Sequence, residues 1–146
     1  LPILVEKLRK AMPGIAISTD VIVGFPGESE EDFRQTLTLL EEIQFDWGFI
    51  FKYSTREGTP AAAWPSLPEE LIEARHQECL ALLDRISLRK RSAFLGSQHE
   101  VLMESAAFGR TRTNYKVQVS GNTAPGETVR VEIIGVEKAT LQGKVI

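Results

Sequence analysis

The stretch TDVIVGFPGESEEDF, residues 19–33, joins an apolar strand to a glycine–proline turn and an acidic helix start. Residues 15–23 are rich in apolar and β-branched side chains, as is typical of a parallel strand covered on both faces. Ser29 suits a helix N-cap, and Asp32, three residues later, makes an imperfect capping box. A buried strand that runs through a tight turn into a capped helix predicts an α/β fold.

The neighbouring segments extend this pattern on both sides. Before the strand, apolar residues recur at helical spacing until Pro13. After it, Phe33, Leu37, Leu40 and Ile43 form the stripe of a second helix, and residues 47–53 are typical of a second strand. We expect three aromatic side chains of that strand to lie in the core: Trp47, Phe49 and Phe51. A long amphipathic helix then begins near Pro68 and ends in a basic run, Arg89 to Arg91.

The chain changes character after Gly96. Short β-type runs at 99–103, 115–119, 128–134 and 141–146 are separated by turn residues. Four or five short strands in so short a segment favour a small antiparallel β-barrel, an architecture that often binds oligonucleotides. We therefore predict two domains, an α/β part over residues 1–95 and a barrel over residues 96–146.

Composition limits the possible functions. The chain has 146 residues, is 42% hydrophobic and has a net charge of -3, which indicates a globular protein that is not basic overall. Residues 96–146 nevertheless carry 6 basic and 5 acidic side chains, so a polyanion is better received there than by the acidic first part. The single cysteine, Cys79, forms no internal disulfide and cannot alone ligate a cluster or a zinc ion. No apolar run reaches the ~18 residues of a membrane span, so we expect a cytoplasmic protein without membrane contact.

The turn at Gly24–Glu28 is a candidate ligand site. It follows a parallel strand, and ligands of α/β folds bind at the carboxyl edge of the sheet. Gly24 and Gly27 let backbone approach a ligand, while Pro26 stiffens the turn. The helix start is surrounded by four acidic side chains, Glu28, Glu30, Glu31 and Asp32. They would repel a phosphate, which favours a nucleoside or an amino acid as the ligand. The alternative is a tight strand-to-helix connection with no ligand.

Three separated motifs resemble one enzyme family. ISTDVIVGFPGESEEDF, FKYSTREGTPAA and GRTRTNYKV follow each other as in the carboxyl-terminal part of the methylthiotransferases, which are radical S-adenosylmethionine enzymes that end in a TRAM domain. The resemblance runs from about Val5 to Ile146, and GRTRTN favours the MiaB-type branch that modifies tRNA. It implies the last part of a partial (β/α) barrel followed by TRAM, with S-adenosylmethionine and 4Fe-4S clusters as cofactors of the full-length enzyme.

The resemblance also implies what the family does and what this chain lacks. Members form a 5'-deoxyadenosyl radical that activates C2 of a hypermodified adenosine beside the anticodon, and sulfur comes through an auxiliary cluster. The cluster loop CxxxCxxC does not occur in this sequence. We therefore expect a fragment whose missing amino-terminal part belongs to the same chain, and which by itself binds no cofactor or metal and has no catalytic residue.

Cofactor-binding residues follow from the first two motifs. The resemblance places Gly24, Phe25, Pro26, Gly27 and Glu28 beside the adenosine of the cofactor. The apolar contact to adenine comes either from Val21 and Val23 or from Ile22, because alternation alone leaves the phase open in a strand covered on both faces.

Two charged residues complete this predicted cofactor site. Asp20 is a candidate polar contact or, equally, a hydrogen-bonded structural carboxylate. Arg56 could pair with a carboxylate or phosphate, or form a salt bridge to Glu57 or Glu28. We expect Trp64 to pack between the domains.

The third motif supplies a candidate tRNA interface. It combines cations for phosphates, hydroxyl and amide groups for sugars and base edges, and an aromatic ring for stacking: Arg110, Thr111, Arg112, Thr113, Asn114, Tyr115 and Lys116. Alternation would place Arg110 and Arg112 on one face. The alternative is a solvated hairpin, since two arginines make a weak basic patch.

Two classes of function follow. The first is a methylthiotransferase part that acts at the tRNA anticodon arm, on an isopentenyladenosine-type nucleoside or on threonylcarbamoyl-adenosine. The second is a stand-alone, non-catalytic RNA-binding adaptor. A short α/β segment leaves an uncovered sheet edge, so we also expect self-association through that edge.

Overall fold

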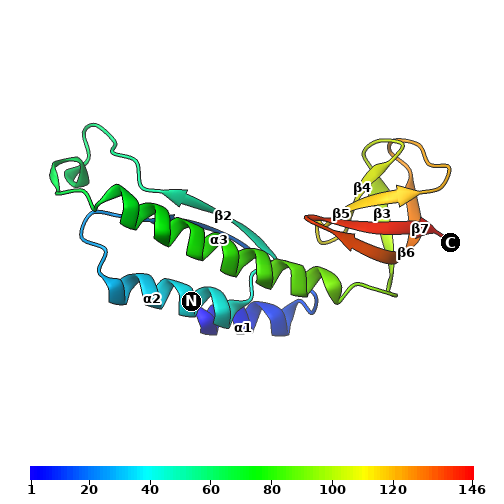
Figure 1. Cartoon of the computed structure of the whole chain (residues 1–146). Helices are drawn as coiled ribbons and strands as arrows, with labels where there is room; N and C mark the ends of the chain where they lie inside the picture. Colours follow the sequence, from blue (N-terminus) through cyan, green and yellow to red (C-terminus); the bar gives the residue numbers. More distant parts are fainter. The chain divides into compact units, whose positions relative to one another are not determined.

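The structure is a computed structural model that describes all 146 residues. It divides into two compact units, one of Leu1–Lys10 and Ile17–Ser87 and one of Ala11–Ala16 and Leu88–Ile146. The division falls inside a helix, eight residues before the boundary predicted at 95/96. Figure 1 shows the elements in order: α1 (Pro2–Ala11), β1 (Ser18–Val23), α2 (Glu30–Ile43), β2 (Trp47–Lys52), η1 (Pro60–Ala63), α3 (Glu69–Ser92), β3 (Gln98–Met103), β4 (Phe108–Thr111), β5 (Lys116–Ser120), β6 (Thr128–Glu137) and β7 (Thr140–Val145).

The first unit is a two-stranded parallel sheet packed against helices. β1 and β2 pair in register from Ser18↔Trp47 to Val23↔Lys52. One core joins side chains from all three helices to one face of this sheet; its members include Val5, Val23, Phe33, Leu40, Ile50, Cys79 and Leu83. The predicted order of helix, strand, helix and strand is confirmed, and so is the α/β class of this part.

Only one face of the sheet is covered, contrary to the prediction for β1. Val23 is fully buried, whereas Ile22 is 58% exposed on the opposite face. In β2, Phe49 and Phe51 are 61% and 50% exposed, so the prediction that they lie in the core was wrong. The physical reason is that all three helices pack on the face of Val23 and Ile50. β1 therefore has the alternating burial of a half-covered sheet, and β2 buries Ile50 between the exposed Phe49 and Phe51.

The start of α2 follows its sequence signals closely. The Asp32 amide donates to Ser29 Oγ at 3.1 Å, and the Ser29 amide donates to Asp32 Oδ2 at 2.9 Å. This is a complete capping box, although Asp rather than Glu occupies the third helical position. Hydrogen bonds from Ser29 hold the pKa of Asp32 below its ordinary value. The helix direction after the strand-end turn is thereby fixed locally.

The second unit contains a closed five-stranded barrel in the order β3-β4-β5-β7-β6. The predicted barrel is confirmed, but β5 and β7 pair in parallel, so the barrel is mixed rather than wholly antiparallel. Its interior is formed by alternate residues, among them Val101, Met103, Val117, Val131, Ile133 and Leu141. β4 was not among the four expected strands. It is only four residues long and contains Gly109, whose lack of a side chain avoids a clash with the Leu102 carbonyl oxygen.

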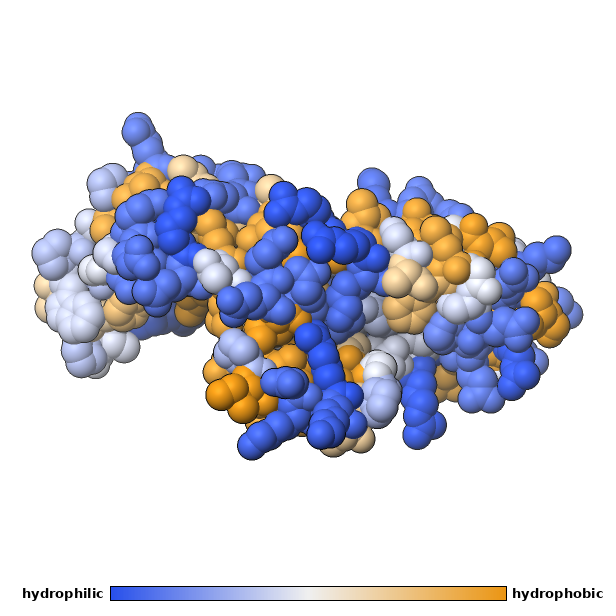
Figure 2. Space-filling model, turned by 90° about the horizontal axis from the view of Figure 1, so that it is seen from below, coloured by the Kyte–Doolittle hydropathy of each residue, from blue (hydrophilic) through white to orange (hydrophobic).

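Apolar residues also reach the surface of the first unit. Figure 2 views the side of α1 and α2 and shows hydrophobic patches among charged side chains. In α1 the exposed apolar residues include Ile3 and Leu4, at 70% and 56%. Val5 is the buried residue of this helix. No helix in the structure is both long and apolar enough to cross a membrane.

Candidate functional site

The turn after β1 has the geometry that its glycines and proline predict. The Glu28 amide donates to the Phe25 carbonyl at 2.9 Å. Pro26 and Gly27 occupy the two central positions, and Gly27 has φ 88°. This combination is that of a type II turn, which requires positive φ at its third residue. Phe25 and Gly27 are exposed, whereas Pro26 is buried.

Gly24 is required both by its backbone conformation and by the closeness of α3. Its φ is 77°, and a Cβ atom there would lie 2.7 Å from Cγ1 of Ile72 in α3. The backbone of the turn therefore packs directly on α3. Any larger residue would have to adopt a left-handed conformation and also displace the Ile72 side chain.

A buried ion pair closes the turn. Arg75 of α3 is 4% exposed and donates from Nη1 to Glu28 Oε1 at 2.6 Å and to the Glu28 carbonyl at 3.0 Å. The other oxygen of the Glu28 carboxylate accepts from the Gly24 amide at 3.2 Å. The guanidinium also lies 5.1 Å from the ring centroid of Phe33. We call this set, Gly24, Glu28, Phe33 and Arg75, the turn clasp.

The turn clasp changes the role expected for Glu28. Its two carboxylate oxygens bind Arg75 and the Gly24 amide, so they hold the turn and do not project toward a ligand. Glu30 is also compensated, because hydrogen bonds from Arg34 and then Arg75 lower its pKa. The repulsion of phosphate inferred from the acidic helix start is correspondingly weaker than the sequence indicates. Neither residue pairs with Arg56, which excludes the predicted salt bridge between Arg56 and Glu28.

Sequence analysis did not single out Arg75, although a signal was present. It lies in α3 between Ile72 and Cys79, at the spacing of the residues that bury this helix. A cation on an apolar stripe requires a buried partner. The partner could not be chosen from the sequence, because 47 positions separate Arg75 from Glu28.

An aromatic pocket lies at the carboxyl ends of β1 and β2. Phe25 follows β1, Tyr53 follows β2, and their ring centroids are 5.1 Å apart in an edge-to-face arrangement. Trp64 packs on Phe25 at 5.9 Å. The pocket has a volume of about 380 Å³ and is lined by Phe25, Tyr53, Arg56, Thr59, Pro60, Ala61 and Trp64. Trp64 therefore packs on the strand-end turn, whereas the sequence led us to expect it between the domains.

Arg56 is the only charged residue that lines the aromatic pocket. It is exposed, and none of the ion pairs of the structure involves it. Its carbonyl accepts a hydrogen bond from Thr59 Oγ1 at 2.8 Å, which shapes the loop that carries it. The guanidinium remains available for an anionic ligand.

The open face of the sheet resolves the phase left open for β1. Val23 is fully buried and Val21 packs against the core, so neither offers a surface to a cofactor. Val23, predicted as a contact residue, is therefore not accessible to a ligand in this structure, and Ile22 is the exposed residue of the two. Asp20 is exposed on the same face, in register with Phe49 of β2. One carboxylate thus lies among apolar and aromatic side chains.

The predicted RNA-binding motif forms the hairpin between β4 and β5. Thr111 and Tyr115 are 6% and 5% exposed, and Tyr115 packs on Phe94 with ring centroids 4.6 Å apart. The expectation that a base stacks on Tyr115 is therefore wrong, because the ring is buried in this structure. Alternation explains the burial: Tyr115 precedes Val117 and Val119, which also point into the barrel.

The cations of this hairpin remain outside the barrel. Arg110 donates to Glu104 Oε1 at 3.1 Å and to Asn114 Oδ1 at 3.2 Å, so its charge is partly compensated. Lys116 lies 4.5 Å from the ring centroid of Phe108. Arg112 is exposed, as is Asn114, which has φ 67° at the turn.

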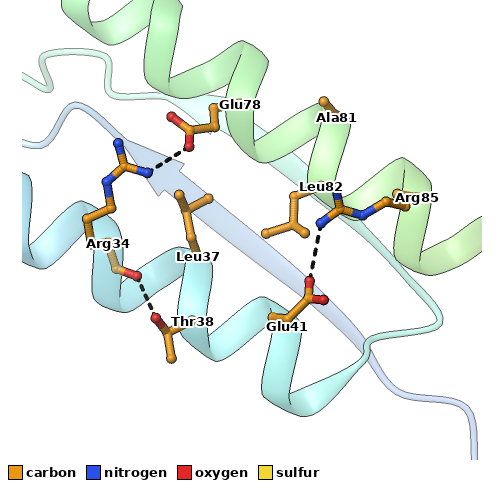
Figure 3. Close-up of a pocket in the computed structure, with 8 residues that line it drawn as sticks. All are labelled: Arg34, Leu37, Thr38, Glu41, Glu78, Ala81, Leu82 and Arg85. Carbon is orange, nitrogen blue, oxygen red and sulfur yellow. Dashed lines mark hydrogen bonds and ion pairs between the residues drawn. The ribbon is translucent and has the colours of Figure 1, made fainter.

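A larger cavity lies elsewhere in the first unit and is lined by none of the predicted site residues. It has a volume of about 480 Å³ and lies between α2 and α3 (Figure 3). Leu37 and Leu82 line it, and ion pairs bridge it on either side, Arg34–Glu78 at 2.9 Å and Arg85–Glu41 at 3.5 Å. We interpret it as a groove between packed helices whose polar groups satisfy one another.

The thiol chemistry of the chain is limited. Cys79 is fully buried, and burial raises the pKa of its thiol to about 11. The thiolate that metal binding requires is therefore disfavoured at neutral pH. No three His, Cys, Asp or Glu side chains are grouped so that they could hold a metal ion.

Known proteins resemble this chain along nearly its whole length. A tRNA-2-methylthio-N(6)-dimethylallyladenosine synthase of Clostridium botulinum strain Hall is 41% identical to this chain in an alignment that covers 98% of it. The synthase of the same name from Methylacidiphilum infernorum is 44% identical over 96% of the chain. The resemblance to the methylthiotransferases is confirmed. A synthase of Akkermansia muciniphila is 44% identical over 88% of the chain. No protein-family model matches. The chain spans 34%, 32% and 27% of these three synthases, about a third of their length.

Breaking the turn clasp should destabilise the first unit strongly. Arg75→Ala would leave the largely buried Glu28 carboxylate without its cation, a change that typically costs about 3–5 kcal/mol. Arg85→Ala is the matched control, because it removes an arginine of the same helix from an exposed pair and should cost less than about 1 kcal/mol. Urea unfolding followed by tryptophan fluorescence measures both, since Trp47 and Trp64 belong to the first unit. Equal losses would contradict a structural role for the clasp.

Substitution of the two turn glycines should separate backbone strain from close packing. Gly27→Ala faces open space at positive φ, so we expect a loss of about 1–2 kcal/mol in the free energy of unfolding. Gly24→Ala adds the clash with Ile72 and should lose clearly more. In the double variant Gly24→Ala/Ile72→Ala, the difference attributable to the clash should shrink. The same urea titration tests this, and equal losses for the two glycines would disprove direct packing of the turn on α3.

Proposed function

We propose that this chain is part of a tRNA methylthiotransferase that adds a methylthio group to C2 of N(6)-dimethylallyladenosine beside the anticodon. The observation that carries the proposal is its 41% identity, over 98% of its length, to a synthase named for that product. The name favours dimethylallyladenosine over threonylcarbamoyl-adenosine, the alternative kept open from the sequence. A tRNA substrate also supports a cytoplasmic location.

The open sheet face and the strand-end turn support a role in holding S-adenosylmethionine. Ile22 and Phe49 offer an apolar surface to an adenine, and Asp20 offers a carboxylate to ribose hydroxyls. Gly27 exposes the backbone of the turn that follows β1. When bound, the cofactor supplies the radical chemistry of the reaction. The part of this chain is to bind and orient: the turn clasp fixes Gly24 and Glu28 so that the exposed residues keep their positions.

The residues of this chain do not fit an iron–sulfur cluster. Cluster ligation uses several thiolates, whereas Cys79 is the one cysteine and is buried. In our proposal the clusters therefore bind to the part of the enzyme that this chain does not include, about two thirds of the length of the named synthases.

The barrel has the proposed role of a TRAM domain that contacts the anticodon arm. Arg112 and Lys116 project from the hairpin, with Arg110, Thr113 and Asn114 beside them. Exposed cations suit phosphates, and the polar groups suit sugars and base edges. We leave Thr111 and Tyr115 out of this interface because both are buried.

A chimaeric enzyme tests the catalytic proposal. The region of the Clostridium botulinum synthase that aligns with this chain would be replaced by residues 1–146 and expressed in cells that lack their own methylthiotransferase. We expect 2-methylthio-N(6)-dimethylallyladenosine in tRNA digests analysed by mass spectrometry. The intact synthase is the positive control. A folded, cluster-loaded chimaera that leaves the nucleoside unmethylthiolated would overturn the proposed function.

Salt dependence tests the barrel interface. Binding of the chain to an anticodon stem-loop would be measured against salt for the wild type, for Arg112→Ala/Lys116→Ala, and for Arg130→Ala/Lys144→Ala. The last pair removes the same charge from exposed positions of β6 and β7. We expect only the hairpin variant to reduce the slope of log K against log salt. The slope should fall by about 1.4, because each of two lost phosphate contacts contributes about 0.7. The same slope for both variants would show that net charge, not the hairpin, binds RNA.

A further inference from the structure

We propose that the aromatic pocket receives the dimethylallyl group of the substrate adenosine, and that Arg56 at the pocket pairs with a phosphate of the same RNA. This inference rests on the proposed function, because it names a recognition site for that substrate. It assigns Phe25 and Arg56, which the sequence led us to expect at the cofactor, to the substrate, and leaves the open sheet face to the cofactor. The argument depends on the shape, the chemistry and the position of the pocket.

The pocket suits a small branched hydrocarbon. Three aromatic rings, those of Phe25, Tyr53 and Trp64, form its walls, and Pro60 and Ala61 complete them. The ring planes of Tyr53 and Trp64 meet that of Phe25 edge to face, at 75° and 88°. Ligand pockets typically have volumes of roughly 300–1,000 Å³, so 380 Å³ is enough for a prenyl group with part of its base.

The polar groups at the pocket suit an adenosine within RNA, while its apolar walls suit the substituent. Arg56 carries the only charge of the lining and has no ion pair. It can therefore bind an anion beside the pocket, while the apolar walls exclude an anion from its interior. The hydroxyl of Tyr53 is buried and has no hydrogen-bond partner within the chain. Buried polar groups are nearly always partnered, and exceptions deserve a functional explanation. An adenine that bears the dimethylallyl group carries ring nitrogens that can accept such a hydrogen bond.

The position of the pocket agrees with a substrate site. It lies where both parallel strands end, because Phe25 follows β1 and Tyr53 follows β2. In α/β folds this edge of the sheet is the one that binds ligands. Phe25 belongs to the turn that Arg75 holds through Glu28, so one wall of the pocket is fixed by the turn clasp.

Binding to matched RNAs tests the proposal. Anticodon stem-loops would differ only in the nucleoside beside the anticodon: adenosine, dimethylallyladenosine or threonylcarbamoyl-adenosine. Each buried CH₂ group contributes about fourfold in affinity, so partial burial predicts a preference of about 10- to 100-fold for the dimethylallyl RNA. Equal affinity of the wild-type chain for all three would overturn the inference. So would a preference for threonylcarbamoyl-adenosine that Arg56→Ala abolishes, because Arg56 would then read its carboxylate.

Variants assign the preference to the pocket. Trp64→Ala and Ala61→Glu should each reduce the preference to less than about threefold. Trp64→Ala should leave affinity for the unmodified RNA unchanged, whereas the added carboxylate of Ala61→Glu, at the same pocket as Arg56, should also weaken binding of that RNA. Arg56→Ala should weaken all RNAs alike and flatten the salt dependence by about 0.7. Phe51→Ala, which removes a 50% exposed aromatic side chain outside the pocket, should keep the preference. Ala61→Glu retains Trp64, so it answers the case in which Trp64→Ala unfolds the loop, and thermal unfolding checks both variants.

The outcomes separate this inference from the proposed function. If the chimaera makes the methylthio nucleoside but Trp64→Ala and Ala61→Glu keep the wild-type preference, the pocket assignment is wrong and the function stands. If these variants instead lose binding of S-adenosylmethionine to the chimaera and keep the RNA preference, the pocket belongs to the cofactor. A chimaera that makes no product overturns the function itself, whatever the RNA preference.

Discussion

The structure of the candidate site depends on the ion pair between Arg75 and Glu28. Both carboxylate oxygens, the amide and the carbonyl of Glu28 take part in hydrogen bonds, three of them with Arg75 or Gly24. A buried pair is not necessarily more stable than an apolar contact of the same size. It is, however, directional, because the guanidinium must meet the carboxylate and the carbonyl of one residue. The turn after β1 is therefore fixed to α3 by geometry as well as by burial.

That constraint determines what the chain presents at the end of its sheet. With Gly24 against Ile72 and Glu28 against Arg75, the turn directs Phe25 to the surface, where Tyr53 and Trp64 pack on its ring. The neighbouring sheet face exposes Ile22, Phe49 and Phe51. Contiguous exposed apolar groups mark sites of interaction. Both surfaces are thus consequences of helices that cover only one face of two strands.

Local features were predictable from the sequence, whereas features that depend on distant partners were not. The capping box at Ser29 and the type II turn at Pro26 and Gly27 require only neighbouring residues, and both are present. The phase of β1 depends on which face the helices cover, and that depends on the whole chain. The parallel pairing of β5 with β7 likewise joins strands that are not adjacent in sequence.

The candidate site shows the same division at the level of single residues. Phe25 and Arg56 were found from their motifs, but their common pocket became visible only when the ends of β1 and β2 were brought together. Tyr115 was placed at the surface because its motif is polar. The alternation that buries Val117 and Val119 extends back to it, and the hairpin turn falls just before, at Asn114.

The distribution of charge explains why recognition of the base would have to add to the contacts of the barrel. Two of the seven residues expected to bind RNA are buried, and Arg110 already interacts with Glu104 and Asn114. Few cations then remain for phosphates, and affinity from counterion release grows with their number. The first unit is acidic overall, so it cannot supply general attraction for RNA. In our proposal, selectivity for one adenosine comes from the aromatic pocket, because an apolar pocket beside one unpaired arginine has the chemistry to bind its substituent.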